Sequence, residues 1–171
     1  MAMNIFFSIG ERAGMIGLLA ALADGHMATG VVSYGDTGAE IAKLLYFPVY
    51  RSLGEAEEKM SGDLFLSVHG REIVPRETLG RFRYGGINVH PCYYDFPGAN
   101  PIRRWSHAHR NKTERELEVV AHTMTAKIDR GVPLAREYCV LDPGESEEKI
   151  YNSIYPLYAK VIIRALRKVG Q

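Results

Sequence analysis

The sequence predicts an α/β protein whose mixed, mainly parallel sheet is covered by helices on both faces. Short apolar runs of strand character alternate with helix-like segments in the first half of the chain, which is typical of a doubly wound parallel sheet. The second half adds two strands joined by a short turn, which indicates an antiparallel addition to that sheet. The length of 171 residues suits one domain, and we expect residues 1–171 to form a single Rossmann-like unit.

The composition is that of an ordinary globular protein, with 46% hydrophobic and 24% charged residues. A net charge of +1 gives no reason to expect a nucleic acid or an anionic membrane as partner. Two cysteines exclude a disulfide framework. The first residues lack the pattern of a secretory signal, and no apolar run is long enough to span a membrane, so we expect a cytoplasmic protein.

Strands are expected where short apolar runs end at glycine or polar residues. The run Asp63–Val68 is nearly all apolar, which is typical of a central strand covered on both faces. The expected parallel strands are Asn4–Ile9, Val31–Tyr34, Pro48–Tyr50, Asp63–Val68 and Gly86–His90. The expected antiparallel pair is Glu118–Thr125 with Leu134–Val140, around the turn Asp129–Gly131.

Helices are expected between these strands and at the end of the chain. Thr37 and Glu40 have the spacing of a capping box at the start of a helix that must end before Pro48. Ser146 is a good N-cap for a long last helix, whose apolar stripe recurs at helical spacing at Ile150, Ile154, Leu157, Val161 and Ala165. The other expected helices are Gly14–Ala23, Leu53–Met60 and Ile102–His109.

A glycine-rich turn between the first strand and the first helix is the first candidate site. Backbone N–H groups of the segment Gly10–Gly17 could hold a phosphate, but its spacing is neither a dinucleotide fingerprint nor a Walker loop. We favour the interpretation that this segment is only a tight strand-to-helix turn and binds no ligand. Asp36 follows Gly17 at a sequence separation compatible with a ribose contact, so binding of a nicotinamide cofactor stays open as an alternative.

Two histidines end neighbouring strands of the expected sheet. His69 and His90 lie at carboxyl ends, where open α/β sheets form their ligand crevice. Asn88 is two residues before His90, so both side chains point to one side of the strand. An amide that steadies an oxyanion beside an imidazole that moves a proton suits acyl transfer. The alternative is that Asn88 and His90 have no catalytic role and only form hydrogen bonds with backbone groups at the end of the strand. We expect His26 to face water and no histidine to bind a metal.

The sequence around Asn88 resembles a known family. Ile87–Pro91, followed by Pro97–Ile102, is similar to the signature of the formyltransferases that use 10-formyltetrahydrofolate. These include glycinamide ribonucleotide transformylase, methionyl-tRNA formyltransferase and the sugar N-formyltransferases. A second signature is similar in having His122 seven residues before Asp129. Weaker similarities follow the central strand and lie in the last helix, so the resemblance spans Asp63–Leu166.

The resemblance implies a role for each matching residue. Asn88, His90 and Asp129 match the family's catalytic residues, and His122 matches a position beside the site. The implied reaction is attack of a neutral amine on the formyl carbon of 10-formyltetrahydrofolate, with no metal. The implied folate-binding residues are Gly70, Arg71, Ile73, Val74, Ala126, Lys127 and Ile128.

The acceptor side departs from the family pattern. The implied acceptor-side residues are Glu11, Arg12, Tyr93, Tyr94 and Asn100. Glu11 adds a negative charge where the resemblance implies a phosphate, so we expect glycinamide ribonucleotide to be a poor substrate. We also expect the acceptor to carry a ring that stacks on Tyr93 or Tyr94.

The sequence-based function is therefore formyl transfer from 10-formyltetrahydrofolate to a primary amine of a small molecule such as a nucleotide or sugar nucleotide. One alternative is a formyltetrahydrofolate hydrolase with water as acceptor; such enzymes usually carry a further N-terminal domain, which we do not expect here. The other is a folate- or nucleotide-binding module without turnover. The expected partners are folate and the amine, and a homodimer stays open.

Overall fold

In the computed structural model, which describes residues 1–171, seven strands form one sheet in the order β3-β2-β1-β4-β5-β6-β7. The first five strands pair in parallel, while β6 pairs antiparallel with β5 and with β7. The predicted α/β class with a mixed, mainly parallel sheet is confirmed. The strands are β1 (Asn4–Ile9), β2 (Met27–Ser33), β3 (Val49–Tyr50), β4 (Leu64–Val68), β5 (Gly86–Pro91), β6 (Arg115–Thr123) and β7 (Pro133–Leu141).

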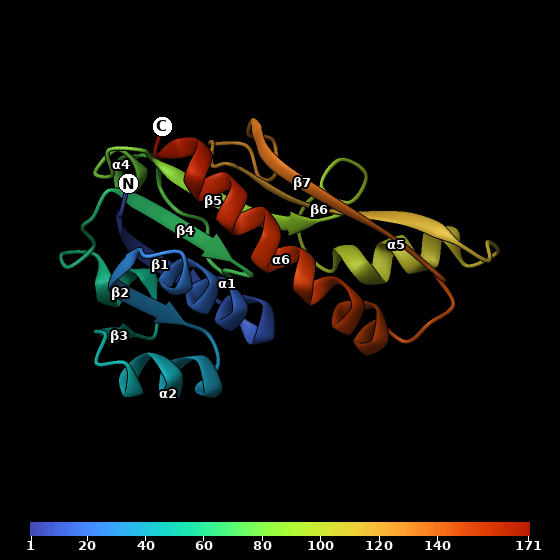
Figure 1. Cartoon of the computed structure of the whole chain (residues 1–171), viewed down its shortest axis with the longest axis horizontal. Coiled ribbons are helices and arrows are strands. Elements are labelled where there is room, and N and C mark those ends of the chain that lie inside the picture. Colours follow the sequence, from blue (N-terminus) through green and yellow to red (C-terminus); the bar gives the residue numbers. More distant parts are fainter.

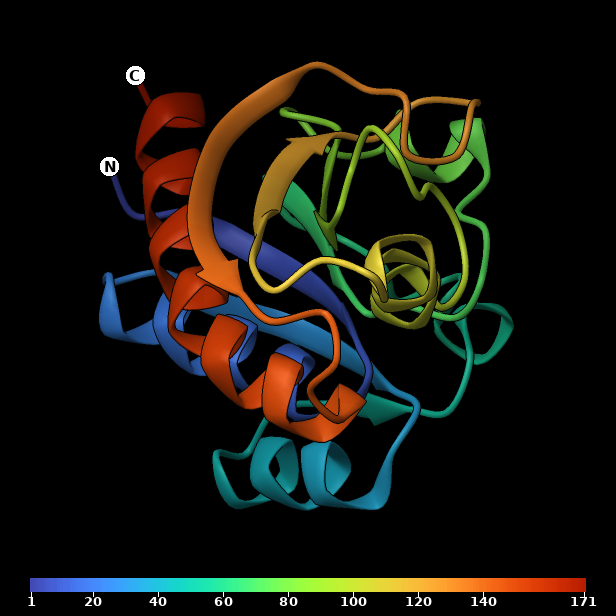
Figure 2. The ribbon, with the colours of Figure 1, turned by 90° about the vertical axis from the view of Figure 1, so that its right-hand side faces the viewer.

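Six helices surround this sheet. They are α1 (Glu11–Ala23), α2 (Asp36–Leu44), α3 (Leu53–Ala56), α4 (Arg76–Leu79), α5 (Pro101–His109) and α6 (Glu147–Val169). The long helix α6 crosses the sheet diagonally with α1 beside it (Figure 1). In the perpendicular view, β7 runs alongside α6 and the two chain termini lie on the same side of the molecule (Figure 2).

The two faces of the sheet bury different amounts of apolar surface. Successive residues of a strand point to opposite faces, and β1 illustrates this. Phe7 and Ile9 belong to a cluster of 29 buried residues under α1 and α6, whereas Phe6 belongs to a cluster of 8. The smaller cluster is covered by α3 and the loops around α4 rather than by long helices. The predicted stripe of α6, from Ile150 to Ala165, is buried throughout.

Some boundaries differ from the sequence prediction because sheet pairing overrides a weak local pattern. β2 begins at Met27 rather than Val31, since its first residues pair with β1 from Asn4 onward. Helix α4 was not predicted, because a four-residue helix is too short to show a period.

Two local predictions are wrong. Helix α2 begins after Gly35, so Thr37 lies inside its first turn and forms no capping box. His26 is buried, with 5% of its surface exposed, and the burial is tolerated because its Nδ1 accepts a hydrogen bond from the backbone N–H of Met3 at 3.1 Å. The predicted N-cap Ser146 is confirmed, since its hydroxyl accepts a hydrogen bond from the Lys149 N–H.

No helix of the chain combines the length and the apolar character needed to cross a membrane.

Candidate active site

A cavity of about 480 Å³ lies at the carboxyl ends of β4 and β5, where the sequence places the crevice. The wall nearest the predicted reaction centre contains Asn88, His90, His122 and Asp129. Two loops, one after β4 and one after β6, form further walls. All seven predicted folate-binding residues line the cavity: Gly70, Arg71, Ile73, Val74, Ala126, Lys127 and Ile128.

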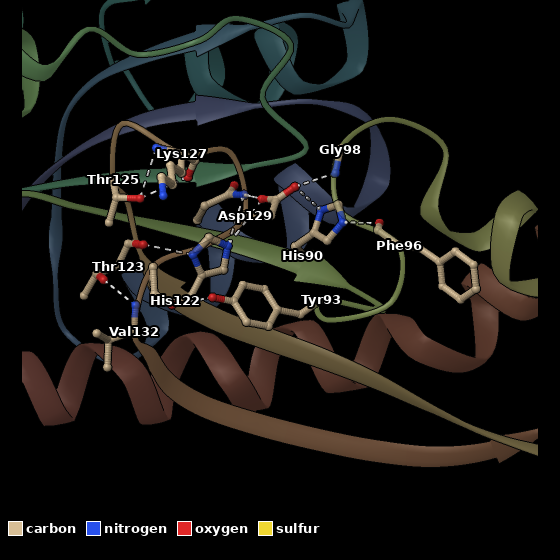
Figure 3. Close-up of polar contacts among 12 residues, drawn as sticks. His90, Tyr93, Phe96, Gly98, His122, Thr123, Thr125, Lys127, Asp129 and Val132 are labelled. Atoms are coloured by element: carbon tan, nitrogen blue, oxygen red, sulfur yellow. Dashed lines mark hydrogen bonds and ion pairs between the residues drawn. The ribbon is translucent and has the colours of Figure 1, made fainter.

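The carboxylate of Asp129 is the centre of the polar contacts in this cavity (Figure 3). Its Oδ1 accepts a hydrogen bond from Asn88 Nδ2 at 2.9 Å and lies 3.4 Å from His122 Nε2. Its Oδ2 accepts a hydrogen bond from the Gly98 N–H at 2.7 Å and lies 3.6 Å from His90 Nδ1. Segments far apart in sequence therefore meet at one buried carboxylate.

The second ring nitrogen of each histidine is bound to a backbone carbonyl. His90 Nε2 lies 3.1 Å from Phe96 O, and His122 Nδ1 lies 2.9 Å from Thr123 O. A carbonyl only accepts, so these two nitrogens carry hydrogen. In the neutral rings, the unprotonated nitrogens are then His90 Nδ1 and His122 Nε2, both directed toward Asp129. The group does not have the geometry of a metal site.

The register of the sheet brings the amide and the second histidine together. Asn88 on β5 is the direct partner of His122 on β6. One hydrogen of the Asn88 amide is used by Asp129, which orients the amide plane. The other lies along the 3.5 Å separation from His122 Nε2, which is long for a hydrogen bond. This hydrogen is therefore free for a better acceptor.

The charges of the group follow from burial and from these contacts. Burial alone raises the pKa of Asp129, but at the acidic pH where this carboxyl titrates the hydrogen bond with His122, the positive charge of protonated His90 and the Gly98 N–H outweigh burial and lower the pKa to about 2. Burial lowers the pKa of His90 below its ordinary value, although the Asp129 carboxylate and the Phe96 carbonyl oppose that shift. Near neutral pH, Asp129 is charged and His90 is neutral.

The loop that carries Asp129 is held in an unusual conformation. Asp129 has φ of 47°, which side chains rarely adopt. Gly131 approaches β6 so closely that a Cβ there would lie 1.6 Å from the Thr123 carbonyl oxygen. The hydroxyl of Tyr93 donates a short hydrogen bond to the Gly131 carbonyl. Only glycine fits at position 131. Gly131 is therefore required for the loop conformation that places Asp129 in the cavity.

The structure corrects part of the predicted acceptor side. Glu11 and Asn100 line the cavity, but Arg12, Tyr93 and Tyr94 do not. Tyr93 is only 3% exposed, because its ring is buried against His122, so it offers no surface to a substrate ring. Tyr94 is exposed but lies under the guanidinium of Arg136, 4.6 Å from the ring centroid.

Other cavity residues were not predicted as site residues. His69 follows β4 and Tyr151 lies on α6, and both line the cavity. Their rings meet edge to face, with centroids 5.7 Å apart. The strand-end position of His69 was the available signal. Nothing in the sequence indicated Tyr151, because its approach to the sheet depends on how α6 packs.

Comparison with known proteins places this chain in a family. Residues 50–166 match the formyl transferase family, and the chain belongs to that family. The chain is 26% identical over 138 residues to a methionyl-tRNA formyltransferase of Coxiella burnetii, with 76% of this chain and 43% of that protein covered. It is 28% identical over 114 residues to one of Rickettsia felis, covering 65% of this chain and 36% of that protein. The chain therefore spans less than half the length of these relatives.

Solved structures show the same fold. A phosphoribosylglycinamide formyltransferase from Bacillus halodurans superposes with a TM-score of 0.74 at 18% identity, covering 95% of this chain and 94% of that one. A formyltetrahydrofolate deformylase from Pseudomonas putida gives a TM-score of 0.73 at 19% identity, covering 96% of this chain and 64% of that one. Transferases and a deformylase thus share this architecture.

Proposed function

We propose that the protein transfers a formyl group from 10-formyltetrahydrofolate to a primary amine. The observation that supports this most strongly is the meeting of Asn88, His90 and Asp129 at one end of a cavity, in a member of the formyl transferase family. An amide donor, a neutral imidazole and a carboxylate are the groups that attack of an amine on a formyl carbon requires.

Each side chain has one task in this reaction. The neutral His90 takes a proton from the attacking amine at Nδ1, and the Asp129 carboxylate 3.6 Å away stabilises the resulting imidazolium. The free amide hydrogen of Asn88 donates to the oxygen that becomes negative as the amine adds to the formyl carbon. The same proton then moves from His90 to the departing folate nitrogen, which returns the imidazole to its neutral form.

The folate side of the cavity suits a flat, partly apolar molecule. Ile73 and Ile128 are exposed at 76% and 56%, one on each loop that lines the cavity. Thr125 and Lys127 form a turn, in which the Thr125 hydroxyl donates to Lys127 O at 3.0 Å (Figure 3). This turn orders the backbone of the second loop, whose groups we propose to bind the pterin ring.

The test measures tetrahydrofolate release with and without an amine. Release that depends on the amine, with a formylated amine as product, is the expected result; release at the same rate in water alone would instead indicate a hydrolase. Asn88→Ala and His90→Ala are expected to lower turnover by about 100-fold or more. His107→Ala, which removes an exposed histidine of α5, is the matched control. Full turnover by His90→Ala would contradict the proposal.

A further inference from the structure

Glu11 presents a carboxylate to the cavity from the first residue of α1. Its side chain is 61% exposed, and its φ of 56° is rare for a residue other than glycine. His69, across from it, also has a positive φ, of 55°. Such conformations cost free energy and cluster where a side chain must be aimed at a ligand. Neither residue has a part in the formyl-transfer steps above.

A partly buried histidine and a fully buried tyrosine position this carboxylate. His69 Nδ1 lies 3.5 Å from Glu11 Oε2, and His69 Nε2 lies 2.7 Å from the hydroxyl of Tyr158, which is fully buried on α6. Gly10 permits the approach, because a Cβ there would lie 2.3 Å from the His69 carbonyl oxygen. With Tyr158 donating to Nε2, the Nδ1–H of the neutral ring points at Glu11. Glu11 is thus held in place by the His69 ring.

The charge of Glu11 is only weakly balanced by neighbouring groups. The hydrogen bond with His69 lowers the pKa of Glu11, so the group is ionised near neutral pH. Arg71 Nη2 lies 3.9 Å from Oε1, but both side chains are more than 60% exposed, and such surface pairs contribute little. The Arg71 side chain is therefore free to move toward another anion.

One aromatic ring lines the same part of the cavity, with a second ring and a second carboxylate close to it on α6. Tyr151 lines it and stacks on Tyr155, with centroids 6.0 Å apart and planes inclined by 27°. Burial raises the pKa of Tyr151, and the nearby carboxylates of Glu147 and Glu11 raise it further. The basic side chains near this group are Arg71, which lines the cavity, and Arg12, near Tyr155. Carboxylates beside tyrosine faces are the chemistry that binds an ammonium or guanidinium group.

We propose that Glu11 is a specificity-determining residue, which selects an acceptor amine bearing a second, cationic group and holds that group beside Tyr151. The inference rests on the proposed formyl transfer and names its substrate class. The amine that reacts is neutral at the moment of attack, so the cation bound by Glu11 is a different group of the same molecule. An acceptor with a phosphate there is repelled by Glu11.

The test compares three probe amines in the wild-type enzyme and in Glu11→Gln. The probes are 1,4-diaminobutane, butylamine and O-phosphoethanolamine, with 10-formyltetrahydrofolate saturating. The wild type is expected to prefer diaminobutane over butylamine by about tenfold or more in kcat/KM. Glu11→Gln is expected to remove that preference mainly through KM. Glu40→Gln, which neutralises an exposed carboxylate on α2, is expected to keep the wild-type preference.

Two further measurements distinguish failure of the proposed role of Glu11 from failure of the proposed formyl transfer. Calorimetric titration of diaminobutane without folate is expected to show binding by the wild type that is about tenfold weaker in Glu11→Gln. Tyr158→Phe, which removes only the anchoring hydroxyl, is expected to raise KM for diaminobutane more than for butylamine. Transfer to butylamine with no preference for diaminobutane would overturn the role of Glu11 and leave formyl transfer standing. Transfer to none of the amines, with no diaminobutane binding, would overturn both.

Discussion

The ring of Tyr93 packs against the ring of His122, with centroids 4.6 Å apart and planes inclined by 44°. The hydroxyl of the same tyrosine donates to the carbonyl of Gly131, two residues beyond Asp129. A single buried side chain from the loop after β5 therefore contacts both the histidine and the turn that surround the Asp129 carboxylate (Figure 3).

Removal of the Tyr93 hydroxyl tests whether this contact stabilises the site. Tyr93→Phe keeps the ring on His122 but loses the hydrogen bond to Gly131, so the free energy of unfolding should fall by about 1–2 kcal/mol. Turnover should fall with it, because the Asp129 turn loses a tether. Chemical denaturation and steady-state kinetics measure the two effects. Tyr94→Phe, at the exposed neighbour, is the control; equal effects of both variants would show that the buried bond contributes nothing specific.

The pH dependence of turnover reports the ionisation of His90. Because the pKa of His90 lies below its ordinary value of about 6.5, the imidazole is neutral at pH 7, and kcat should fall only as acid protonates it. The Asp129 carboxylate opposes this lowering. Asp129→Asn should therefore move the acidic limb of the profile to still lower pH, in addition to reducing kcat. An acidic limb at an unchanged pH would mean that another group titrates.

The same shift has a consequence for stability. A histidine whose pKa is lower in the folded than in the unfolded protein contributes its full stabilisation above the unfolded value, about pH 6.5, and loses it as pH falls through the folded value. His90→Asn should therefore weaken the loss of stability below pH 6.5. Denaturation at several pH values between 7 and 5 measures this change, with His107→Asn as the control. Identical pH dependence in the wild type and His90→Asn would contradict the lowered pKa.

The sequence predicted what local pattern and spacing determine. The apolar runs located the strands, and the alternation of side chains along β5 placed Asn88 and His90 on one side. The spacing from His122 to Asp129 led to a resemblance, and the structure brings these residues within 3.4 Å.

What the sequence could not predict depends on packing between distant segments. Tyr93 was expected to offer its ring to the acceptor because the resemblance places its loop on the acceptor side, whereas contacts with His122 on β6 and with the Gly131 turn bury it. The His69–Tyr158 contact joins residues 89 positions apart, through the way α6 crosses the sheet. Neither contact leaves a periodic signal in the chain.

The close approach of Gly131 to β6 can be tested by a single substitution. Gly131→Ala places a Cβ where the Thr123 carbonyl already lies, so the turn that carries Asp129 must shift. We expect a loss of about 2 kcal/mol or more in unfolding free energy and a strong loss of turnover. Gly35→Ala is the matched control, because a Cβ there meets nothing within 4 Å and needs no strained backbone. Equal stability of the two variants would refute the proposed constraint at Gly131.

The folate side of the cavity is tested through a side chain that makes no contact with Asp129. Ile73 is 76% exposed and lines the cavity, so a bound folate should cover it and gain apolar burial. Ile73→Asp removes that burial, which is worth about 1.5 kcal/mol or more, and should weaken binding of a non-reactive folate analogue by about tenfold. Leu44→Asp, at a 77% exposed residue of α2 away from the cavity, should bind like the wild type. Binding is measured by calorimetry and by the rise of Tm with ligand concentration. If Ile73→Asp binds the analogue as tightly as Leu44→Asp, the folate does not lie between these two loops.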